Sequence, residues 1–285
     1  MKIAVHFGAT DQTADPGRVA HEAEIRGFEG IFFPEHTHMP VQRRDIPYPN
    51  NDERLVHYRR LYSPFTAMAW AAGATKKLTV GTCVSLPVEH DPIILAKTLA
   101  SIDVMSGGRV VYGFGFGWLD EEMIDHGIDP KKRRAVTREK MLAAKAIWSQ
   151  DEASFTGEFV RFPPCFCWPK PLQKPGPPLL VGGAFPYGAR RAIAYGDGWV
   201  PHARRPAYGD VLSLLPEFRK LAVEAGRDPA TLPITIFGAA EDVDAIRRYR
   251  DAGVARLIFN LASAKADEVL PVLDRCATLM QKAQS

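Results

Sequence analysis

Apolar and polar positions alternate along this chain in a pattern that predicts β-strands and helices in regular succession. Short runs rich in β-branched and aromatic residues are each followed by a stretch whose apolar positions recur with a helical period. Glycine-containing or polar turns separate most of these elements, although the connection from Glu35 to about Tyr58 is a longer, proline-rich loop. The pattern predicts strands at Lys2–Phe7, Gly30–Pro34, Leu78–Leu86, Arg109–Gly115, Leu179–Val181, Gly198–Pro201, Ile234–Phe237 and Arg256–Asn260, and helices at Pro16–Arg26, Leu61–Ala74, Pro92–Met105, Arg134–Trp148, Tyr187–Tyr195, Ala207–Ala225, Asp242–Ala252 and Ala266–Gln281.

This alternation indicates an α/β fold with a parallel sheet, because parallel strands need a crossover connection. Eight such units close most simply into a (β/α)8 TIM barrel, and an open doubly wound sheet is the alternative. The length of 285 residues fits one barrel domain, residues 1–285. The rhythm breaks at Asp151–Pro178, where a hairpin turning at Thr156-Gly157 precedes a proline-rich stretch. We expect this segment to be an insertion after the fourth βα unit.

Composition narrows the function classes. The net charge of +3 gives no support for nucleic acid or a membrane surface as the main partner. No apolar run approaches the ~20 residues of a membrane span, and the N-terminus lacks a signal-peptide core. Cys165 and Cys167 are separated by one residue, which does not match zinc spacing, so no metal site is expected. These features favour a cytoplasmic protein that binds a small molecule.

Glycines at the predicted strand ends point to a bound cofactor. Gly115 and Gly117 recur with period two, which leaves backbone against which a flat ligand can lie. Trp118 follows and has two interpretations, a wall for a ring system or a rim residue. Gly182-Gly183-Ala184 precedes a helix, whose amides favour an anion, although a tight turn alone would also need glycine. Together these turns predict a seat for a cofactor with a phosphate.

Acid–base chemistry has one candidate pair, Glu35-His36, directly after the second predicted strand. A histidine in a barrel mouth can exchange protons near neutral pH, whereas the alternative is an ordinary loop histidine such as His38. A redox role for Cys83 is the less favoured interpretation, because a buried free cysteine usually packs as a small apolar group. The chain has neither a nucleophile elbow nor a phosphate-binding loop ending in Lys-Ser/Thr, so hydrolysis and phosphoryl transfer have no apparent machinery.

Four motifs resemble one family. They are PEHTHMP at Pro34–Pro40, the long motif at Leu78–Arg109, YGFGFGWLDEEM at Tyr112–Met123 and LLVGGAFPYGARRAIAYGDGW at Leu179–Trp199. Together they are similar to the luciferase-like monooxygenase family, and within it to the short branch that uses a deazaflavin, coenzyme F-420. The resemblance implies an eight-stranded barrel with an insertion after the fourth unit and a flavin-like ring across the mouth.

The resemblance also implies roles for particular residues. It places a non-proline cis peptide between Cys83 and Val84, against the ring, and the cofactor phosphate at Gly182-Gly183. It aligns Glu35-His36 with an acidic-histidine pair, in which relatives more often carry Asp at the first position. Relatives that oxidise sugar phosphates carry a glutamate where this chain has Trp118. That difference disfavours a sugar phosphate and implies a more apolar or aromatic substrate pocket.

The sequence therefore predicts an oxidoreductase that moves a hydride to or from 8-hydroxy-5-deazaflavin, coenzyme F-420, with a small organic substrate. His36 and Glu35 are the predicted catalytic residues. The predicted cofactor contacts are Cys83, Val84, Gly115, Gly117, Trp118, Gly182, Gly183 and Ala184. A two-component monooxygenase that uses FMN is the second hypothesis, and a flavin-binding barrel without turnover is the third. We expect a homodimer.

Overall fold

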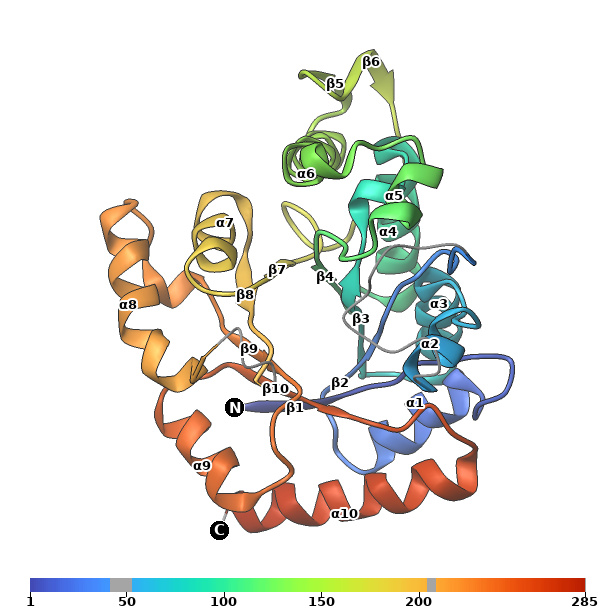
Figure 1. Ribbon diagram of the computed structural model, residues 1–285, viewed down its shortest axis with the longest axis vertical. Helices are drawn as coiled ribbons and strands as arrows, with labels where there is room; N and C mark the ends of the chain where they lie inside the picture. The colour runs from blue at the N-terminus through green and yellow to red at the C-terminus, as the bar shows by residue number, and fades with distance from the viewer. Residues whose placement is uncertain (42–52, 204–208, 285) are drawn as a thin grey trace.

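The strands of the computed structural model form the wall of a barrel with helices around it (Figure 1). The structure describes residues 1–41, 53–203 and 209–284, so part of the predicted loop from Glu35 to Tyr58 lies outside the described residues. The barrel strands are β1 (Lys2–His6), β2 (Gly30–Phe33), β3 (Thr79–Ser85), β4 (Val110–Phe114), β7 (Leu179–Gly182), β8 (Gly198–Val200), β9 (Thr235–Phe237) and β10 (Arg256–Asn260).

These eight strands are parallel neighbours in one sheet, in the order β8-β7-β4-β3-β2-β1-β10-β9. Isolated parallel bridges from Trp199 to Ile234 and from His202 to Phe237 join the first strand of this order to the last. The sheet is therefore a nearly closed barrel. The predicted TIM-barrel fold is confirmed, and the alternative of an open doubly wound sheet is wrong.

Helices cover the outside of the barrel between successive strands. The helices are α1 (Pro16–Ile25), α2 (Glu53–Tyr58), α3 (Pro64–Ala74), α4 (Pro92–Ser106), α5 (Asp120–Asp125), α6 (Arg133–Ser149), α7 (Tyr187–Tyr195), α8 (Val211–Glu224), α9 (Val243–Asp251) and α10 (Ala266–Gln284), with short 3-10 turns η1 (Pro87–Glu89), η2 (Pro130–Lys132) and η4 (Pro229–Thr231). None of the described helices has the length and apolar character that a bilayer crossing requires.

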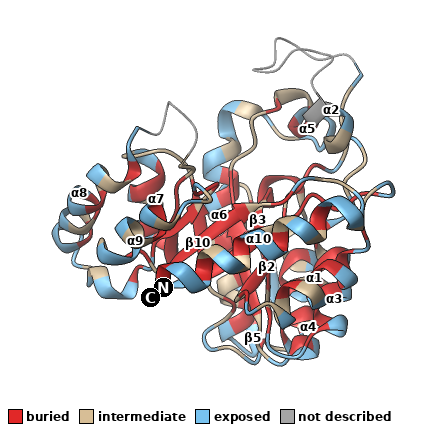
Figure 2. Cartoon of the chain, turned by 90° about the horizontal axis from the view of Figure 1, so that it is seen from below, coloured by how far each residue is buried: buried red, intermediate tan, exposed pale blue. Residues whose placement is uncertain are grey.

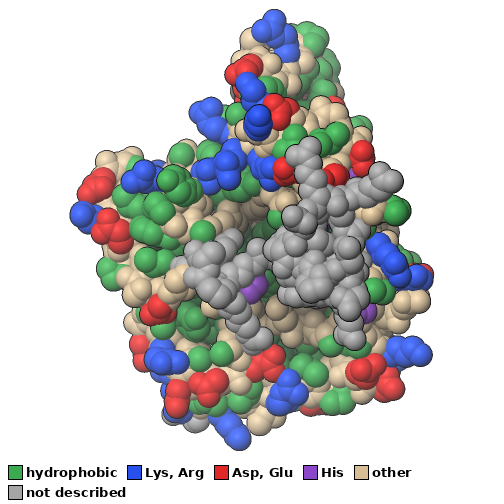
Figure 3. Space-filling model, viewed as in Figure 1, with side chains coloured by type: hydrophobic (Ala, Val, Ile, Leu, Met, Phe, Trp, Pro, Cys, Tyr) green, Lys and Arg blue, Asp and Glu red, His purple; other side chains and the backbone are tan. Residues whose placement is uncertain are grey.

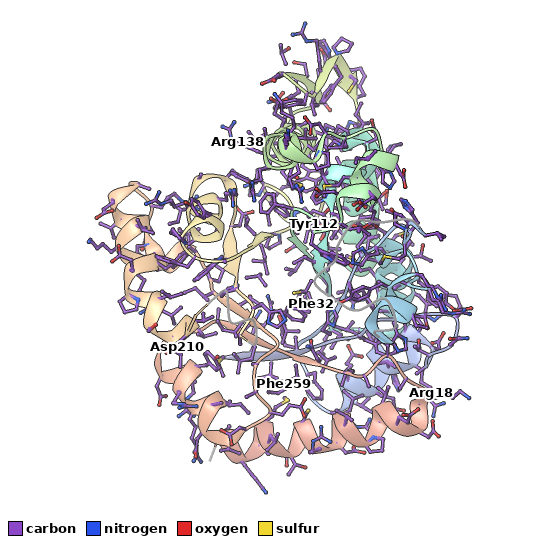
Figure 4. The ribbon with its side chains drawn as sticks, in the orientation of Figure 1. Arg18, Phe32, Tyr112, Arg138, Asp210 and Phe259 are labelled. Atoms are coloured by element: carbon purple, nitrogen blue, oxygen red, sulfur yellow. The ribbon has the colours of Figure 1, made fainter. Side chains whose placement is uncertain are left out.

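Strand residues alternate between two apolar layers, as the pleat requires. On β1, Ala4 points into the barrel, while Ile3 and Val5 pack outward against the helices. Phe32 of β2, labelled in Figure 4, belongs to the inner layer. Figure 2 shows the consequence: the strands are buried between helices that expose only their outer surfaces. The outer layer forms the larger apolar cluster and holds the helices on the barrel.

The predicted insertion begins with an antiparallel hairpin of β5 (Glu152–Thr156) and β6 (Arg161–Phe166), which projects beyond the barrel in Figure 1. The predicted turn after Thr156 is confirmed, but the second strand runs four residues past Phe162. Prolines at 163 and 164 are accommodated because this two-stranded ribbon consists only of edge strands.

Two short helices at the mouth were not predicted from the hydrophobic pattern. Helix α2 ends the long loop after β2, and α5 follows the glycines after β4. Each has six residues, fewer than the two turns over which a helical period becomes visible. Both contribute side chains to the region around His36.

Candidate functional site

A cavity of about 370 Å³ opens at the carboxyl ends of the barrel strands. Figure 3 looks onto this face and shows a hollow with Lys and Arg side chains along its upper edge. The lining comes from the ends of β3, β4, β7, β8 and β9 and from α6 and α7. It consists of Val84, Leu86, Gly115, Phe116, Gly117, Trp118, Arg133, Arg134, Gly182, Gly183, Ala184, Tyr187, Gly188, Arg191, Val200, His202 and Phe237.

A larger cavity of about 600 Å³ lies among residues at the opposite ends of the strands. Its charged groups already satisfy one another: Glu29 accepts from Lys2 at 3.1 Å and from Arg256 at 2.7 Å. Arg109 donates to the carbonyl oxygens of Ala72 and Leu78. These charged groups thus bind one another and the barrel backbone, and the active sites of TIM barrels lie at the carboxyl ends of their strands, so the mouth is the better candidate for chemistry.

Val84 forms one wall of the mouth, and two glycines make room for it. The peptide between Cys83 and Val84 is cis, as the resemblance predicted. A Cβ on Gly115 would lie 2.9 Å from Val84 Cγ2, and one on Gly182 would lie 3.3 Å from Val84 Cγ1. The sequence interpretation assigned the bare backbone at Gly115 to the ligand alone. The structure adds a packing reason, since the two glycines accommodate Val84.

Gly117 and Trp118 turn the chain from β4 towards α5. Gly117 has φ +70°, a conformation that side chains disfavour, and a Cβ there would press on Met123 Cε at 3.1 Å. The Trp118 ring meets the His36 ring edge-on, with centroids 5.4 Å apart. Trp118 therefore lines the cavity and also packs on the candidate acid–base residue.

The Gly182-Gly183-Ala184 turn leads into α7 and is held firmly. Gly183 has φ +131°, and a Cβ on Gly188 would lie 2.3 Å from the Gly183 carbonyl oxygen, so both positions exclude a side chain. Trp199 Nε1 donates to that oxygen at 2.9 Å. The predicted strand-to-helix turn is therefore present at the cavity wall.

Two arginines beside this turn have no acidic partner in the part of the chain that the structure describes. Arg191 lies 5.0 Å above the Phe116 ring, and no carboxylate among the described residues is within ion-pair distance of it or of Arg134. Burial and the neighbouring Arg134 lower the pKa of Arg191. An anion held near the two guanidinium groups would relieve this repulsion. Sequence reasoning gave neither arginine a role in cofactor binding: Arg191 lies on the helix after the predicted anion turn, and Arg134 lies in a basic run that is typical of a solvated helix start.

Glu35 is buried, and its carboxylate faces the barrel wall. It accepts from Ser85 Oγ and the Leu86 amide, each at 2.6 Å, and from His90 Nε2 at 2.8 Å. Burial alone would raise the pKa of Glu35, but the hydrogen bonds from His90, Ser85 and Leu86 outweigh it, so the pKa lies below its ordinary value. This carboxylate connects the ends of β2 and β3, and it is not among the residues lining the cavity.

His36 is also buried, but it faces aromatic rings. Its ring centroid lies 4.7 Å from that of Tyr58 and 5.4 Å from that of Trp118. Its Nδ1 lies 2.7 Å from Glu122 Oε2, while Nε2 has no hydrogen-bond partner among the described residues. The consecutive residues Glu35 and His36 therefore make different contacts: Glu35 bonds the barrel wall, and His36 lies between Trp118, which lines the cavity, and Glu122 of α5. Like Glu35, His36 is not itself among the residues lining the cavity.

Glu122 was missed by the sequence analysis. Its side chain is 1% exposed, and besides His36 it accepts from the Thr37 amide at 2.7 Å and from Thr37 Oγ1 at 3.2 Å. The sequence shows two adjacent glutamates, Glu121 and Glu122, and gives no reason to prefer one of them. Only the packing of α5 on the loop after β2 shows that Glu122 faces His36.

The inner floor of the mouth adds two polar atoms that sequence reasoning also missed. His6 and Asn260 are register neighbours on β1 and β10, and both follow inward-facing residues at period two. His6 Nε2 and Asn260 Oδ1 are buried without a hydrogen-bond partner among the described residues. Burial lowers the pKa of His6 to about 4, so this imidazole is neutral near pH 7.

The cysteines offer no reactive group at the mouth. Cys83 is buried, and burial raises the pKa of its thiol far above its ordinary value. It packs in the inner apolar layer with residues such as Phe32 and Val111, which agrees with the predicted packing role. Throughout the described ranges, no His, Cys, Asp or Glu cluster has an arrangement suited to a metal ion.

Comparison with known proteins gives the chain its relatives. A protein-family model for luciferase-like monooxygenases matches residues 4–271. An uncharacterised protein of Mycobacterium tuberculosis is 38% identical over 285 residues, which cover 96% of this chain and 98% of that one. An F-420-dependent hydroxymycolic acid dehydrogenase of the same organism is 28% identical over 239 residues, 81% of this chain and 61% of the relative.

Other relatives carry a different cofactor or reaction in their names. The FMNH(2)-dependent dimethylsulfone monooxygenase of Pseudomonas putida is 39% identical over 118 residues, 39% of this chain and 31% of that one. Among solved structures, monooxygenase RslO1 from Streptomyces bottropensis matches with a TM-score of 0.79 and 22% identity over the whole of both chains, which supports the fold. The family model covers nearly the full length, and so this chain belongs to the luciferase-like monooxygenase family of oxidoreductases.

Proposed function

We propose that this chain transfers a hydride between coenzyme F-420 and a carbon that bears a hydroxyl or carbonyl oxygen, on a small, largely apolar substrate. The observation that carries the proposal is His36: a histidine packed on Tyr58 and on Trp118, which lines the cavity, with one ring nitrogen bonded to a buried carboxylate. The F-420-dependent relative that aligns with 81% of the chain supports this choice of cofactor.

The residues at the mouth fit such a cofactor. Val84, between its two glycines, offers a flat apolar wall, and Arg134 and Arg191 offer positive charge beside the Gly182-Gly183 turn. The flat wall suits a planar ring, and the two guanidinium groups suit an anionic tail. When bound, the deazaflavin supplies one carbon that accepts or donates the hydride.

His36 manages the accompanying proton in this proposal. In the oxidising direction Nε2 accepts the proton of the substrate hydroxyl while the hydride leaves the carbon, and a carbonyl results. In the reducing direction the same nitrogen donates the proton to the carbonyl oxygen. Tyr58 and Trp118 exclude water from the ring and favour an apolar substrate. We assign Glu35 a supporting role, because all its observed bonds hold the end of β3 and η1.

A two-component monooxygenase that uses FMN is the second candidate. The relative from Pseudomonas putida supports it, although the matched region covers only 39% of this chain. FMN also carries a planar ring and a phosphate, so the arginine pair and the Val84 wall accommodate either cofactor. The fold suits both cofactors, so measured affinities for coenzyme F-420 and for FMN are needed to decide between the two reactions.

We also propose that the chain forms a homodimer through α3 and α4. Helix α3 carries no charged residue, and α4 carries only Lys97 and Asp103, of which Asp103 is fully buried. The outward positions include Trp70, Ile94 and Met105, which are 60%, 63% and 77% exposed. Surface helices that are apolar on both faces gain stability when a partner covers the outer one.

Titration of the apo-protein with each cofactor tests the central proposal. We expect oxidised coenzyme F-420 to quench the intrinsic tryptophan fluorescence at lower concentrations than FMN, because Trp118 borders the proposed ring site. A dissociation constant for FMN that is lower than that for F-420 would favour the monooxygenase instead. Saturation by neither cofactor would contradict both proposals.

Gly115→Val tests the wall formed by Val84. The added Cβ must displace the Val84 side chain, since it would lie 2.9 Å from Cγ2. We expect cofactor affinity to fall at least about tenfold, the equivalent of ~1.4 kcal/mol, while the circular dichroism spectrum stays that of a folded barrel. Gly73→Ala is the matched control, because a Cβ there meets nothing within 4 Å. Wild-type affinity in Gly115→Val would place the ring elsewhere.

His36→Ala tests the proton transfer. General acid–base catalysis contributes typically ~10²–10⁴-fold, so we expect turnover to fall by about a hundredfold or more with cofactor affinity changed only a few-fold. The assay follows the absorbance of F-420 with propan-2-ol and longer secondary alcohols, and in reverse with their ketones. His38→Ala, which removes an exposed neighbour paired with Asp125, should retain activity. Full turnover in His36→Ala would assign the proton to water.

Sedimentation equilibrium tests the dimer. We expect the wild type to sediment at twice the chain mass of 31.5 kDa, and Met105→Glu to sediment as a monomer because a charge would enter the interface. Val223→Glu changes an equally apolar, 64% exposed position on α8 and should stay dimeric. A monomeric wild type at micromolar concentration would exclude this interface.

A further inference from the structure

Three buried glutamates lie close to His36, and they differ in their contacts. Glu35 bonds β3 and His90, and Glu122 bonds His36 and Thr37. The carboxyl oxygens of Glu89 have no hydrogen-bond partner among the described residues, and Oε2 lies 4.0 Å from His126 Nε2. Burial, and then the neighbouring carboxylates of Glu122 and Glu35, raise the pKa of Glu89 to about 9. Glu89 is therefore neutral near pH 7, and it adds no negative charge beside Glu122.

We infer that Glu122 is a positioning residue that holds His36 in one tautomer, with the proton on Nδ1 and the lone pair on Nε2. The inference rests on the proposed function, for which Nε2 is the nitrogen that meets the substrate. Glu122 Oε2 lies 2.7 Å from Nδ1, and both side chains are buried, at 1% and 6% exposure. In such surroundings the bond that one ring nitrogen makes determines which nitrogen carries the proton.

Thr37 explains why one oxygen of the group at position 122 must accept hydrogen bonds. The Thr37 amide can only donate, and it donates to Glu122 Oε1 at 2.7 Å. Thr37 Oγ1 lies 3.2 Å from the same oxygen. Oε1 is thereby fixed as an acceptor, which orients the carboxylate and leaves Oε2 directed at His36.

A glutamine at position 122 would reverse the arrangement without changing the shape. Its carbonyl oxygen would be needed by the Thr37 amide, so its NH₂ group would face His36 Nδ1 and donate to it. The His36 proton would then move to Nε2, which would no longer accept a proton from a substrate hydroxyl. Replacing the orienting aspartate of a serine protease triad by asparagine has this effect, and it lowers kcat by about 10⁴.

Other charged groups around this pair already have partners of their own. His126 Nε2 bonds Thr37 Oγ1 at 2.8 Å, and His38 Nε2 bonds Asp125 at 2.9 Å. Lys140 donates to the Val88 carbonyl at 2.7 Å. None of these groups reaches His36 Nδ1, so among the described residues Glu122 alone sets the tautomer.

Isotope-edited NMR of the histidine ring nitrogens tests the tautomer in the cofactor-free protein. His36 signals are identified by their loss in His36→Gln. We expect a protonated Nδ1 and an unprotonated Nε2 in the wild type, and the reverse in Glu122→Gln. A wild-type His36 with its proton on Nε2 would overturn the inference before any variant is made, which covers the case in which Glu122→Gln does not fold.

Turnover with F-420 and secondary alcohols then tests the consequence. Glu122→Gln should lose kcat by about 10²–10⁴-fold while KM and cofactor affinity change only a few-fold. Asp125→Asn is the matched control, because it neutralises another carboxylate of α5 that is paired with a histidine, and it should retain activity.

The outcomes separate this inference from the proposed function. Wild-type turnover in Glu122→Gln, together with loss in His36→Ala, would overturn the role of Glu122 and leave the proposed function intact. Wild-type turnover in His36→Ala would instead overturn the proposed proton transfer, whatever the NMR shows of the tautomer. Loss in both variants with a reversed tautomer in Glu122→Gln supports both proposals.

Discussion

The hydrogen bonds to the buried carboxylate of Glu35 hold the mouth of this barrel together. One side chain after β2 binds Ser85 at the end of β3, the amide of Leu86 and His90 beyond η1. A charge in this position is stable only because donors surround it, which is why its pKa is lowered despite burial. Since that pKa is depressed, the associated stability is present above the unfolded-state pKa and is lost as the pH falls. The position of His36 depends on these hydrogen bonds of Glu35, because they fix the backbone to which the next residue belongs.

The sequence was sufficient for the barrel but only partly for the mouth. Strand and helix periods are local, so β10 was predicted at its observed bounds and most other elements within three residues. The sequence also shows the glycine pattern after β4, but it does not show one of the reasons why glycine is needed there. The contact between Gly115 and Val84 joins two strands, and only the assembled sheet shows that a Cβ at one would strike the other. Pattern analysis identified the necessary residue and gave an incomplete reason for it.

The site residues to which the sequence alone assigns no role share a physical feature. Glu122, Tyr58, Arg134 and Arg191 lie on helices, where each looks like an ordinary polar or aromatic residue. Their importance comes from what faces them: His36 is 86 positions from Glu122 in sequence. A single sequence carries no signal for such a pairing. Short helices such as α5 are hardest to anticipate, because tertiary contacts rather than their own propensity make them form.

The fold does not decide the cofactor, and the charges at the mouth do not decide it either. Relatives named for F-420 and for FMN both align with this chain, and an arginine pair suits the phosphate of each. The choice between the two reactions must therefore come from the residues beside the reacting carbon. Moving a hydride to or from a carbon bearing oxygen requires one proton at one place, and one fixed imidazole nitrogen meets that need. His36, with Nδ1 bound to Glu122 and aromatic rings around it, is such a group. The proposed dehydrogenase or reductase activity therefore depends on the contact between the loop after β2 and helix α5, where Glu122 fixes the ring of His36.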